Sequence, residues 1–145
     1  MKMDLLALDI VFDTNILLKH HLQGLWKLRE MAERTVVKMT FLIPQIVLTE
    51  LHHFSDPELE VFARKARKYI QVLENKGTGL VIETPQDAEQ ANSLFESKLN
   101  DDEILKCCLL MKQRGKDVVL FSDDHMLLIK ARIYSLKAFQ RRTLP

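Results

Sequence analysis

Four acidic residues stand where the chain is expected to pass from a strand into a helix or to begin a helix. Asp13 and Asp124 follow short apolar runs typical of strands, while Glu50 and Asp101 lie in or near the first turns of helical patterns. In a doubly wound α/β sheet these ends converge on one side, so the four carboxylates are expected to meet in one crevice. Clustered anions repel one another and are tolerated chiefly around divalent cations.

The chemistry of such a cluster is that of hard oxygen ligands, which suit Mg²⁺ or Mn²⁺. A bound ion neutralises a nonbridging oxygen of a phosphodiester and activates water for attack. The sequence therefore predicts metal-dependent phosphodiester hydrolysis. The predicted catalytic and metal-binding residues are Asp13, Glu50, Asp101 and Asp124.

Each acid also has a purely structural interpretation. Asp13 is placed to cap the helix after the first strand, and Glu50 is placed as a solvated helix residue. Asn100 and Glu103 match a capping box, which leaves open which acid of that run faces inward. The same ambiguity holds for the acidic pair at 123–124.

The elements that must position these acids follow from the spacing of apolar residues. Strands are expected at residues 10–12, 40–44, 80–82, 118–121 and 136–139, and helices at 16–31, 46–54, 57–75, 85–98, 100–114 and 125–132. Strands that alternate with helices, without hairpin turn signals, predict an α/β fold. We expect a three-layer α/β/α sandwich with a central parallel sheet of about five strands.

The composition fits one domain over residues 1–145, either complete or excised from a longer protein. Lys and Arg total 21 against 20 Asp and Glu, so a nucleic-acid site must be a local patch. The adjacent Cys107 and Cys108 are expected to fill the core, which favours a reducing compartment over a disulfide framework. Without a run of about 18 apolar residues, we expect no signal peptide and no membrane partner.

Two basic runs are candidates for contact with a nucleic-acid backbone. They would hold a single strand with weak sequence preference, or else form ordinary solvated helix faces. The first comprises Arg64, Lys65, Arg67 and Lys68, and the second comprises Arg141 and Arg142.

Four blocks, at residues 11–18, 43–51, 100–105 and 118–124, resemble in order the signature blocks of PIN domains. That family consists of metal-dependent endoribonucleases with a parallel sheet between helices. The narrower similarity is to eukaryotic RNA-surveillance PIN domains, including nonsense-mediated decay endonucleases and a nuclear transcript-quality endonuclease associated with transcription. It is carried by residues 100–109, and by Asp-Asp followed by Lys-Ala at 130–131.

The resemblance implies the same four catalytic and metal-ligating acids, Asp13, Glu50, Asp101 and Asp124. Its secondary positions are Asn15, a polar helper, Ser122, a hydroxyl group, and the further acids Asp102 and Asp123. One departure is His125, where relatives often carry Arg or Lys, and it bears on how the substrate phosphate is contacted.

By the same resemblance, the chain is expected to cut single-stranded RNA in RNA quality control, with Mg²⁺ or Mn²⁺, leaving 5′-phosphate and 3′-hydroxyl ends. A nuclear location is expected, with the cytoplasm as the alternative, and protein partners in a surveillance complex are anticipated. The alternative function is a catalytically inactive PIN scaffold that binds proteins. A haloacid dehalogenase phosphatase is disfavoured because the Asp-x-Asp motif is replaced by Asp13-Thr14-Asn15.

Overall fold

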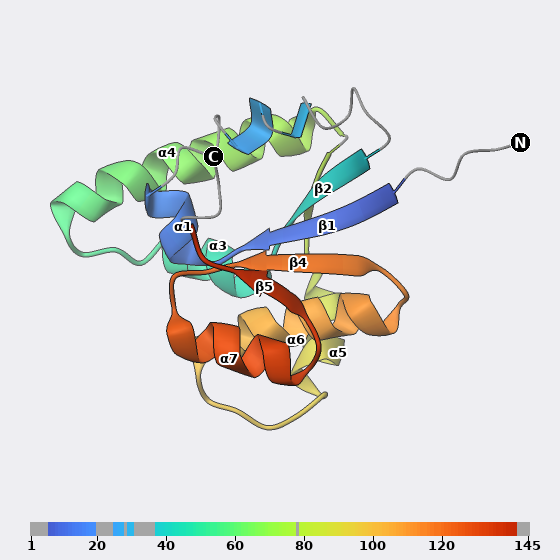
Figure 1. Ribbon diagram of the computed structural model, residues 1–145. Coiled ribbons are helices and arrows are strands. Elements are labelled where there is room, and N and C mark those ends of the chain that lie inside the picture. Colours follow the sequence, from blue (N-terminus) through green and yellow to red (C-terminus); the bar gives the residue numbers. More distant parts are fainter. Residues whose placement is uncertain (1–5, 20–24, 28, 31–36, 78, 142–145) are drawn as a thin grey trace, which may run out of the picture.

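The protein is organised around one sheet of five parallel strands (Figure 1). The computed structural model describes residues 6–19, 25–27, 29–30, 37–77 and 79–141. The strand order is β3-β2-β1-β4-β5, and all neighbouring pairs are parallel. The strands are β1 (Leu6–Phe12), β2 (Val37–Ile43), β3 (Leu80–Ile82), β4 (Asp117–Phe121) and β5 (Lys137–Phe139).

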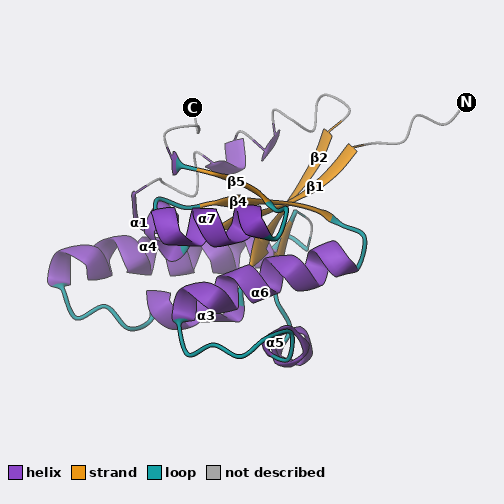
Figure 2. Cartoon of the chain, turned by 60° about the horizontal axis from the view of Figure 1, so that its bottom comes forward, coloured by secondary structure: helices purple, strands orange, loops and turns teal. Residues whose placement is uncertain are grey.

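Helices cover both faces of the sheet, which confirms the predicted three-layer α/β/α fold. Figures 1 and 2 show α1 and α4 on one side and α5, α6 and α7 on the other. Helix α3 lies at the edge where the strands end and contacts α1, α4 and α6. The helices are α1 (Thr14–Lys19), α3 (Gln45–Leu51), α4 (Pro57–Asn75), α5 (Pro85–Asn92), α6 (Asn100–Gln113) and α7 (His125–Ile133).

The central strand β1 is buried on both faces, as expected for a parallel strand between two helical layers. Val11 is fully buried and pairs with Leu42 of β2 and Leu120 of β4. Phe12 makes an edge-on contact with Phe41 at 5.1 Å and stacks on Phe121 at 5.7 Å between ring centroids. These contacts hold the ends of β1 and β4 level with each other.

Local sequence signals explain where α4 begins and which side it buries. The Asp56 side chain accepts hydrogen bonds from the backbone N–H groups of Glu58 and Leu59, and a proline occupies the first turn. Its buried residues recur at helical spacing as one stripe, namely Ala63, Ala66, Ile70 and Leu73. The opposite face is left to solvent.

Helix α6 is the most deeply buried helix among the described residues. Every residue from Ile104 to Met111 is buried, and the side chains of Cys107 and Cys108 are fully enclosed. The prediction that both cysteines fill the core is therefore confirmed. The helix ends at the predicted glycine, because Gly115 adopts a positive φ of 82° that favours residues without a side chain.

The end of α5 and the start of α6 differ from the sequence prediction. Helix α5 ends at Asn92, not near residue 98. The predicted capping box of Asn100 is wrong, because Asn100 is already helical and Leu99 is the N-cap, without a side-chain bond. Ser97 instead organises this end, since its hydroxyl donates to Asp102 and accepts from the backbone N–H of Leu99.

The helix predicted over 16–31 is only partly within the described residues. Helix α1 ends at Lys19, and residues 25–27 and 29–30 are helical. Residues 20–24, 28 and 31 lie outside the described part of the chain. In the portion that the structure describes, no helix combines the length and apolar character needed to cross a membrane.

Candidate active site

Asp13 lies directly after β1, at the edge where the parallel strands end. Its backbone N–H donates a 2.9 Å hydrogen bond to the carbonyl of Phe121, which extends the β1–β4 pairing by one residue. Only 3% of the residue is exposed, and burial raises the pKa of Asp13 above its usual range. Asp13 therefore places a nearly buried carboxyl group at the edge where open α/β sheets bind their ligands.

Ser122 links Asp13 to the other acid at this edge. Its fully buried Oγ donates a 2.7 Å hydrogen bond to Oδ2 of Asp13 and accepts one of 3.0 Å from the backbone N–H of Asp124. Asp124 in turn caps α7, because its Oδ1 accepts from the N–H groups of Met126 and Leu127. One hydroxyl group therefore links the Asp13 carboxylate to the backbone of Asp124.

Asp101, in the first turn of α6, reaches the same cluster. Burial and a hydrogen bond with Asp124 raise the pKa of Asp101 to about 7, and the charges of Asp13, Asp124 and Glu50 add to the effect. The same hydrogen bond lowers the pKa of Asp124. Of the two, Asp101 is the carboxyl group whose protonated form is favoured, because two adjacent carboxylates cannot both ionise freely.

Glu50 lies at the margin of the cluster and is held by a residue that sequence reasoning missed. Oγ1 of the buried Thr14 donates a 3.1 Å hydrogen bond to Oε1 of Glu50. Burial raises the pKa of Glu50, and the charges of Asp13 and Glu103 raise it further. The position of Thr14 beside the strand-end aspartate was the available signal for a site contact.

The secondary acids are paired with cations. Asp102 is buried, and its Oδ1 accepts a 2.9 Å hydrogen bond from Nζ of Lys130. Asp123 pairs with Lys19 at 3.4 Å and with Arg141 at 3.2 Å. Neighbouring acids in the two predicted runs are therefore divided between the cluster and ion pairs.

The remaining predicted helper, Asn15, is exposed on α1. His125 is also exposed, at the start of α7, and its ring Nδ1 lies 3.3 Å from Nε2 of Gln140. Glu103, one of the three acids left open in its run, and Lys130, named only for the family resemblance, were given no site role, yet their charges act on Glu50 and Asp124 respectively. Neither could be assigned before the neighbours of α6 were known.

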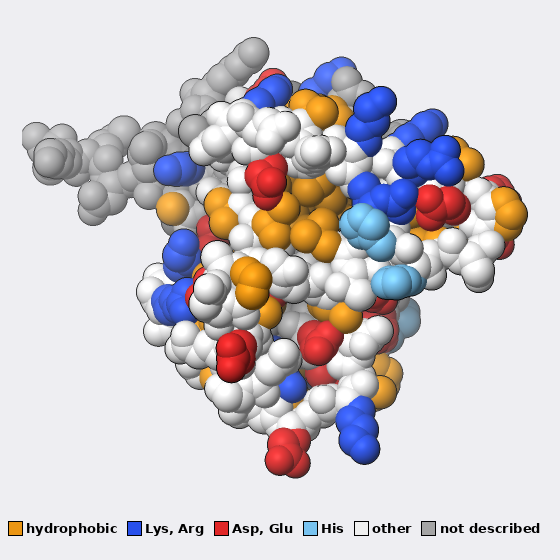
Figure 3. Space-filling view, turned by 180° about the vertical axis from the view of Figure 1, so that it is seen from behind, with side chains coloured by type: hydrophobic (Ala, Val, Ile, Leu, Met, Phe, Trp, Pro, Cys, Tyr) orange, Lys and Arg blue, Asp and Glu red, His pale blue; other side chains and the backbone are white. Residues whose placement is uncertain are grey.

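The predicted basic run borders a groove between α3, α4 and β3. Arg64, Arg67 and Lys68 line it over an apolar floor that includes Leu48 and Ile82. Figure 3 shows an apolar patch on this face with Lys, Arg and His side chains gathered at one side. We name this surface, lined also by His52, Ile70, Gln71 and Glu74, the basic groove.

The four basic side chains of the predicted run differ in their exposure and in their contacts with the protein. Arg67 donates to the carbonyl of Leu51 and forms a 3.0 Å ion pair with Glu60, so it joins α4 to α3. Arg64 is largely exposed, with a loose 3.9 Å contact to Glu60. Lys65 and Lys68 are exposed as well, and Arg142 lies outside the described residues. The exposed members are the ones available to a ligand.

The donor set of the cluster consists of carboxylate and hydroxyl oxygens, which are the ligands that Mg²⁺ and Mn²⁺ prefer. Burial is the main cause of the raised pKa of Asp101, and the negative charges of Asp13, Asp124 and Glu50 raise it further. A divalent cation would offset these negative charges. Within the described ranges, no three His, Cys, Asp or Glu side chains are arranged closely enough to hold a metal ion.

The fold and the acidic cluster define a class of α/β/α proteins that bring carboxylates together at the carboxyl edge of a parallel sheet. Within that class the chain belongs to the PIN domain family, whose sequence profile matches residues 10–142. PIN domains are generally nucleases. The family resemblance seen in the sequence is therefore confirmed.

Two curated relatives match nearly the whole chain. The human Transcriptional protein SWT1 is 30% identical over 144 residues, which cover 93% of this chain and 16% of the relative. An uncharacterized PIN and TRAM-domain containing protein of Thermus thermophilus is 27% identical over 134 residues, or 92% of this chain and 35% of the relative. The chain thus spans about a third or less of these proteins.

Solved structures share the fold. A domain of a functionally unknown protein from Methanocaldococcus jannaschii has a TM-score of 0.62 at 17% identity, over 91% of this chain and 89% of the other. VapBC2 from Rickettsia felis, solved with a DNA fragment from its promoter, has a TM-score of 0.55 at 18% identity, over 91% and 98%. These similarities establish the fold alone.

Proposed function

We propose that the protein is a metal-dependent endoribonuclease that cleaves single-stranded RNA. The observation that carries the proposal is the meeting of Asp13, Asp101 and Asp124, from three separate elements, at the carboxyl edge of the sheet. Structural roles alone do not account for this cluster, because mutual repulsion makes it unfavourable without a cation.

The residues that would hold Mg²⁺ or Mn²⁺ are Asp13, Asp101 and Asp124, with Glu50 at the margin. Such an ion, when bound, supplies charge neutralisation of a phosphate oxygen and activation of water. Ser122 orients the Asp13 carboxylate and holds the backbone of Asp124, and Thr14 orients Glu50. Within the described residues no three of these side chains are already arranged to hold an ion, so metal binding would bring the carboxyl groups closer together.

In the metal-free site, Asp101 titrates near neutral pH. A bound cation would favour the ionised form of the clustered carboxyl groups, so the proton of the attacking water would pass to solvent and the leaving oxygen would take one from solvent. Cleavage at the bond to the 3′-oxygen leaves a 5′-phosphate and a 3′-hydroxyl end.

The exposed cations of the basic groove are proposed to hold the RNA backbone. The acidic cluster and the basic groove both include residues at the C-terminal end of α3, Glu50 in the helix and His52 at its C-cap. Arg64 and Lys68 are the exposed cations of the groove, and Lys65 is exposed on the same helix. Contacts to phosphate alone would give weak sequence preference.

A role in RNA quality control, in the nucleus, follows from the narrower resemblance and from similarity to the Transcriptional protein SWT1. The cytoplasm is the alternative location. Protein partners in a surveillance complex belong to the same proposal.

The test is incubation of the purified chain with an end-labelled, unstructured RNA in Mn²⁺, in Mg²⁺ and in EDTA. We expect internal cleavage with either ion and none in EDTA, and the same RNA made circular should also be cut. An intact RNA under all conditions, together with no Mn²⁺ binding by calorimetry, would favour the protein-binding scaffold instead.

A further inference from the structure

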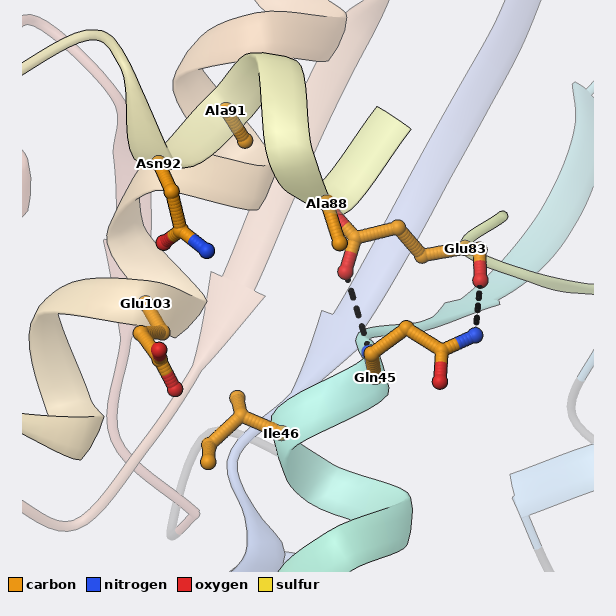
Figure 4. Close-up of a pocket in the computed structure, with 7 residues that line it drawn as sticks. All are labelled: Gln45, Ile46, Glu83, Ala88, Ala91, Asn92 and Glu103. Carbon is orange, nitrogen blue, oxygen red and sulfur yellow. Dashed lines mark hydrogen bonds between the residues drawn. The ribbon is translucent and has the colours of Figure 1, made fainter. Parts of the chain in front are cut away.

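A small second pocket lies between α5, α6 and the first turn of α3 (Figure 4). Its volume is about 60 Å³, enough for a small polar group. It is lined by the carboxylates of Glu83 and Glu103, the amides of Gln45 and Asn92, and the apolar side chains of Ile46, Ala88 and Ala91.

Glu83 is the anchor of this pocket and is 95% buried, with 5% of the residue exposed. Its Oε1 accepts a 3.0 Å hydrogen bond from the backbone N–H of Gln45, and Nε2 of Gln45 donates to the Glu83 carbonyl. Figure 4 shows the carboxyl group fixed between Gln45 and Ala88, extended toward the interior of the pocket. The side chain is therefore held in place by the start of α3.

The second oxygen of this group, Oε2, is buried and has no hydrogen-bond partner among the described residues. The nearby Cys107 thiol is only a weak donor. An unsatisfied buried carboxylate oxygen is unfavourable, so the position calls for a donor. Burial raises the pKa of Glu83, and the charge of Glu103 raises it further, so a cationic donor would satisfy both acids.

The residues that line the pocket indicate which kind of cation would fit it. Two carboxylates, those of Glu83 and Glu103, line the pocket and favour a cation. Ile46, Ala88 and Ala91 offer apolar contact for a short alkyl chain. An alkylammonium group matches both features, because its stem is apolar and its head carries three N–H donors.

We propose that the pocket formed by Glu83, Glu103 and Asn92 binds a primary alkylammonium group. The head would donate to Oε2 of Glu83 and to Glu103, and the stem would lie against Ile46 and the alanines of α5. Such a group comes from a lysine side chain of a protein partner or from a free polyamine. The pocket is lined by none of Asp13, Glu50, Asp101 and Asp124, although the charge of Glu103 also acts on Glu50.

The experiment is an NMR titration of the full chain that follows the backbone amide of Gln45, which reports directly on Glu83. The probes are N-acetyl-lysine methylamide and spermidine, with N-acetyl-norleucine methylamide as the neutral match. We expect saturable shifts with the ammonium probes, with a Kd on the order of 1 mM for so small a ligand, and none with norleucine. Tighter binding of lysine identifies a protein source, and tighter binding of spermidine a polyamine.

Three variants test the assignment. Glu83→Gln and Glu103→Gln should each weaken binding by about tenfold or more. Glu89→Gln, an equal charge change on the exposed face of α5, should leave it unchanged. If Glu83→Gln does not fold, Glu103→Gln alone decides. Equal shifts with norleucine, or binding lost in Asp13→Asn but kept in both glutamate variants, would overturn the proposal.

Discussion

Oγ of Ser122 donates a 2.7 Å hydrogen bond to Oδ2 of Asp13, and so joins the ends of β4 and β1 across 109 residues of sequence. Because this hydroxyl is fully buried, water cannot replace it. Ser122→Ala should therefore leave Asp13 free to rotate and deprive the N–H of Asp124 of its acceptor. We expect about 1 to 2 kcal/mol of destabilisation in urea unfolding and a higher Mn²⁺ concentration for half-maximal cleavage. An unchanged metal requirement would contradict this role.

Asp13→Asn should abolish cleavage while the fold persists. The amide keeps the shape of the side chain but removes the charge that a cation needs, so we expect a loss on the order of 10²-fold or more in RNA cleavage. Since burial disfavours the charged form, the melting temperature of the metal-free protein should not fall. Asp117→Asn, exposed at the opposite end of β4, is the matched control and should retain activity.

The stability of the metal-free protein should depend on Asp101 near neutral pH. Its folded pKa of about 7 lies above the ordinary value of 3.8, so its stabilising contribution is full below pH 3.8 and is lost as pH rises through 7. In EDTA, the melting temperature should fall between pH 5.5 and 8. Asp101→Asn should flatten this decline, and a parallel decline in the variant would contradict the raised pKa of Asp101.

Asp102→Asn should lower the free energy of unfolding, because Asp102 pairs with Lys130. Burial opposes ionisation of Asp102, yet hydrogen bonds from Ser97 and Lys130 lower its pKa overall. Its contribution is therefore present above pH 3.8 and is lost as pH falls through the lowered pKa. We expect about 1 to 3 kcal/mol of destabilisation at pH 7, measured by urea unfolding.

A double-mutant cycle with Lys130→Met gives the energy of this pair directly. We expect the double variant to be less destabilised than the sum of the two single variants, because either substitution alone already breaks the ion pair. Full loss of cleavage in Asp102→Asn without a change in stability would instead make Asp102 the third ligand in place of Asp101.

Reversing two exposed charges of the basic groove should weaken RNA binding. We expect Arg64→Glu/Lys68→Glu to reduce affinity for an unstructured RNA about tenfold at low salt and to flatten the salt dependence. Arg67 is avoided because it bonds to Leu51 and Glu60. Lys76→Glu/Lys137→Glu, exposed elsewhere, is the control, and an equal effect there would reject the groove as the RNA path.

The sheet was predictable because its strands are short apolar runs, each followed by a helical pattern. The meeting of Asp13 with Asp124 followed from the same rule, since the ends of parallel strands lie along one edge. In contrast, the choice between Asp101 and Asp102 depends on Lys130 of α7 and on Ser97, both of which contact Asp102. Spacing within one helix carries no information about such tertiary partners.

The early end of α5 and the hydrogen bond from Thr14 to Glu50 were missed for related reasons. Residues 93–97 lack a strong helix breaker, so the apolar and charged pattern continued past the true end at Asn92. Thr14 and Glu50 are 36 residues apart, and only the placement of α3 beside α1 brings them together. Local propensity decides neither feature.

The enclosure of Cys107 and Cys108 in α6 has a practical consequence. Burial raises the pKa of both thiols and shields them from solvent, so neither forms a reactive thiolate while the core is intact. A maleimide dye can label them only during global opening of the molecule. The rate of maleimide labelling therefore measures how often each variant described above opens, without the introduction of a new cysteine.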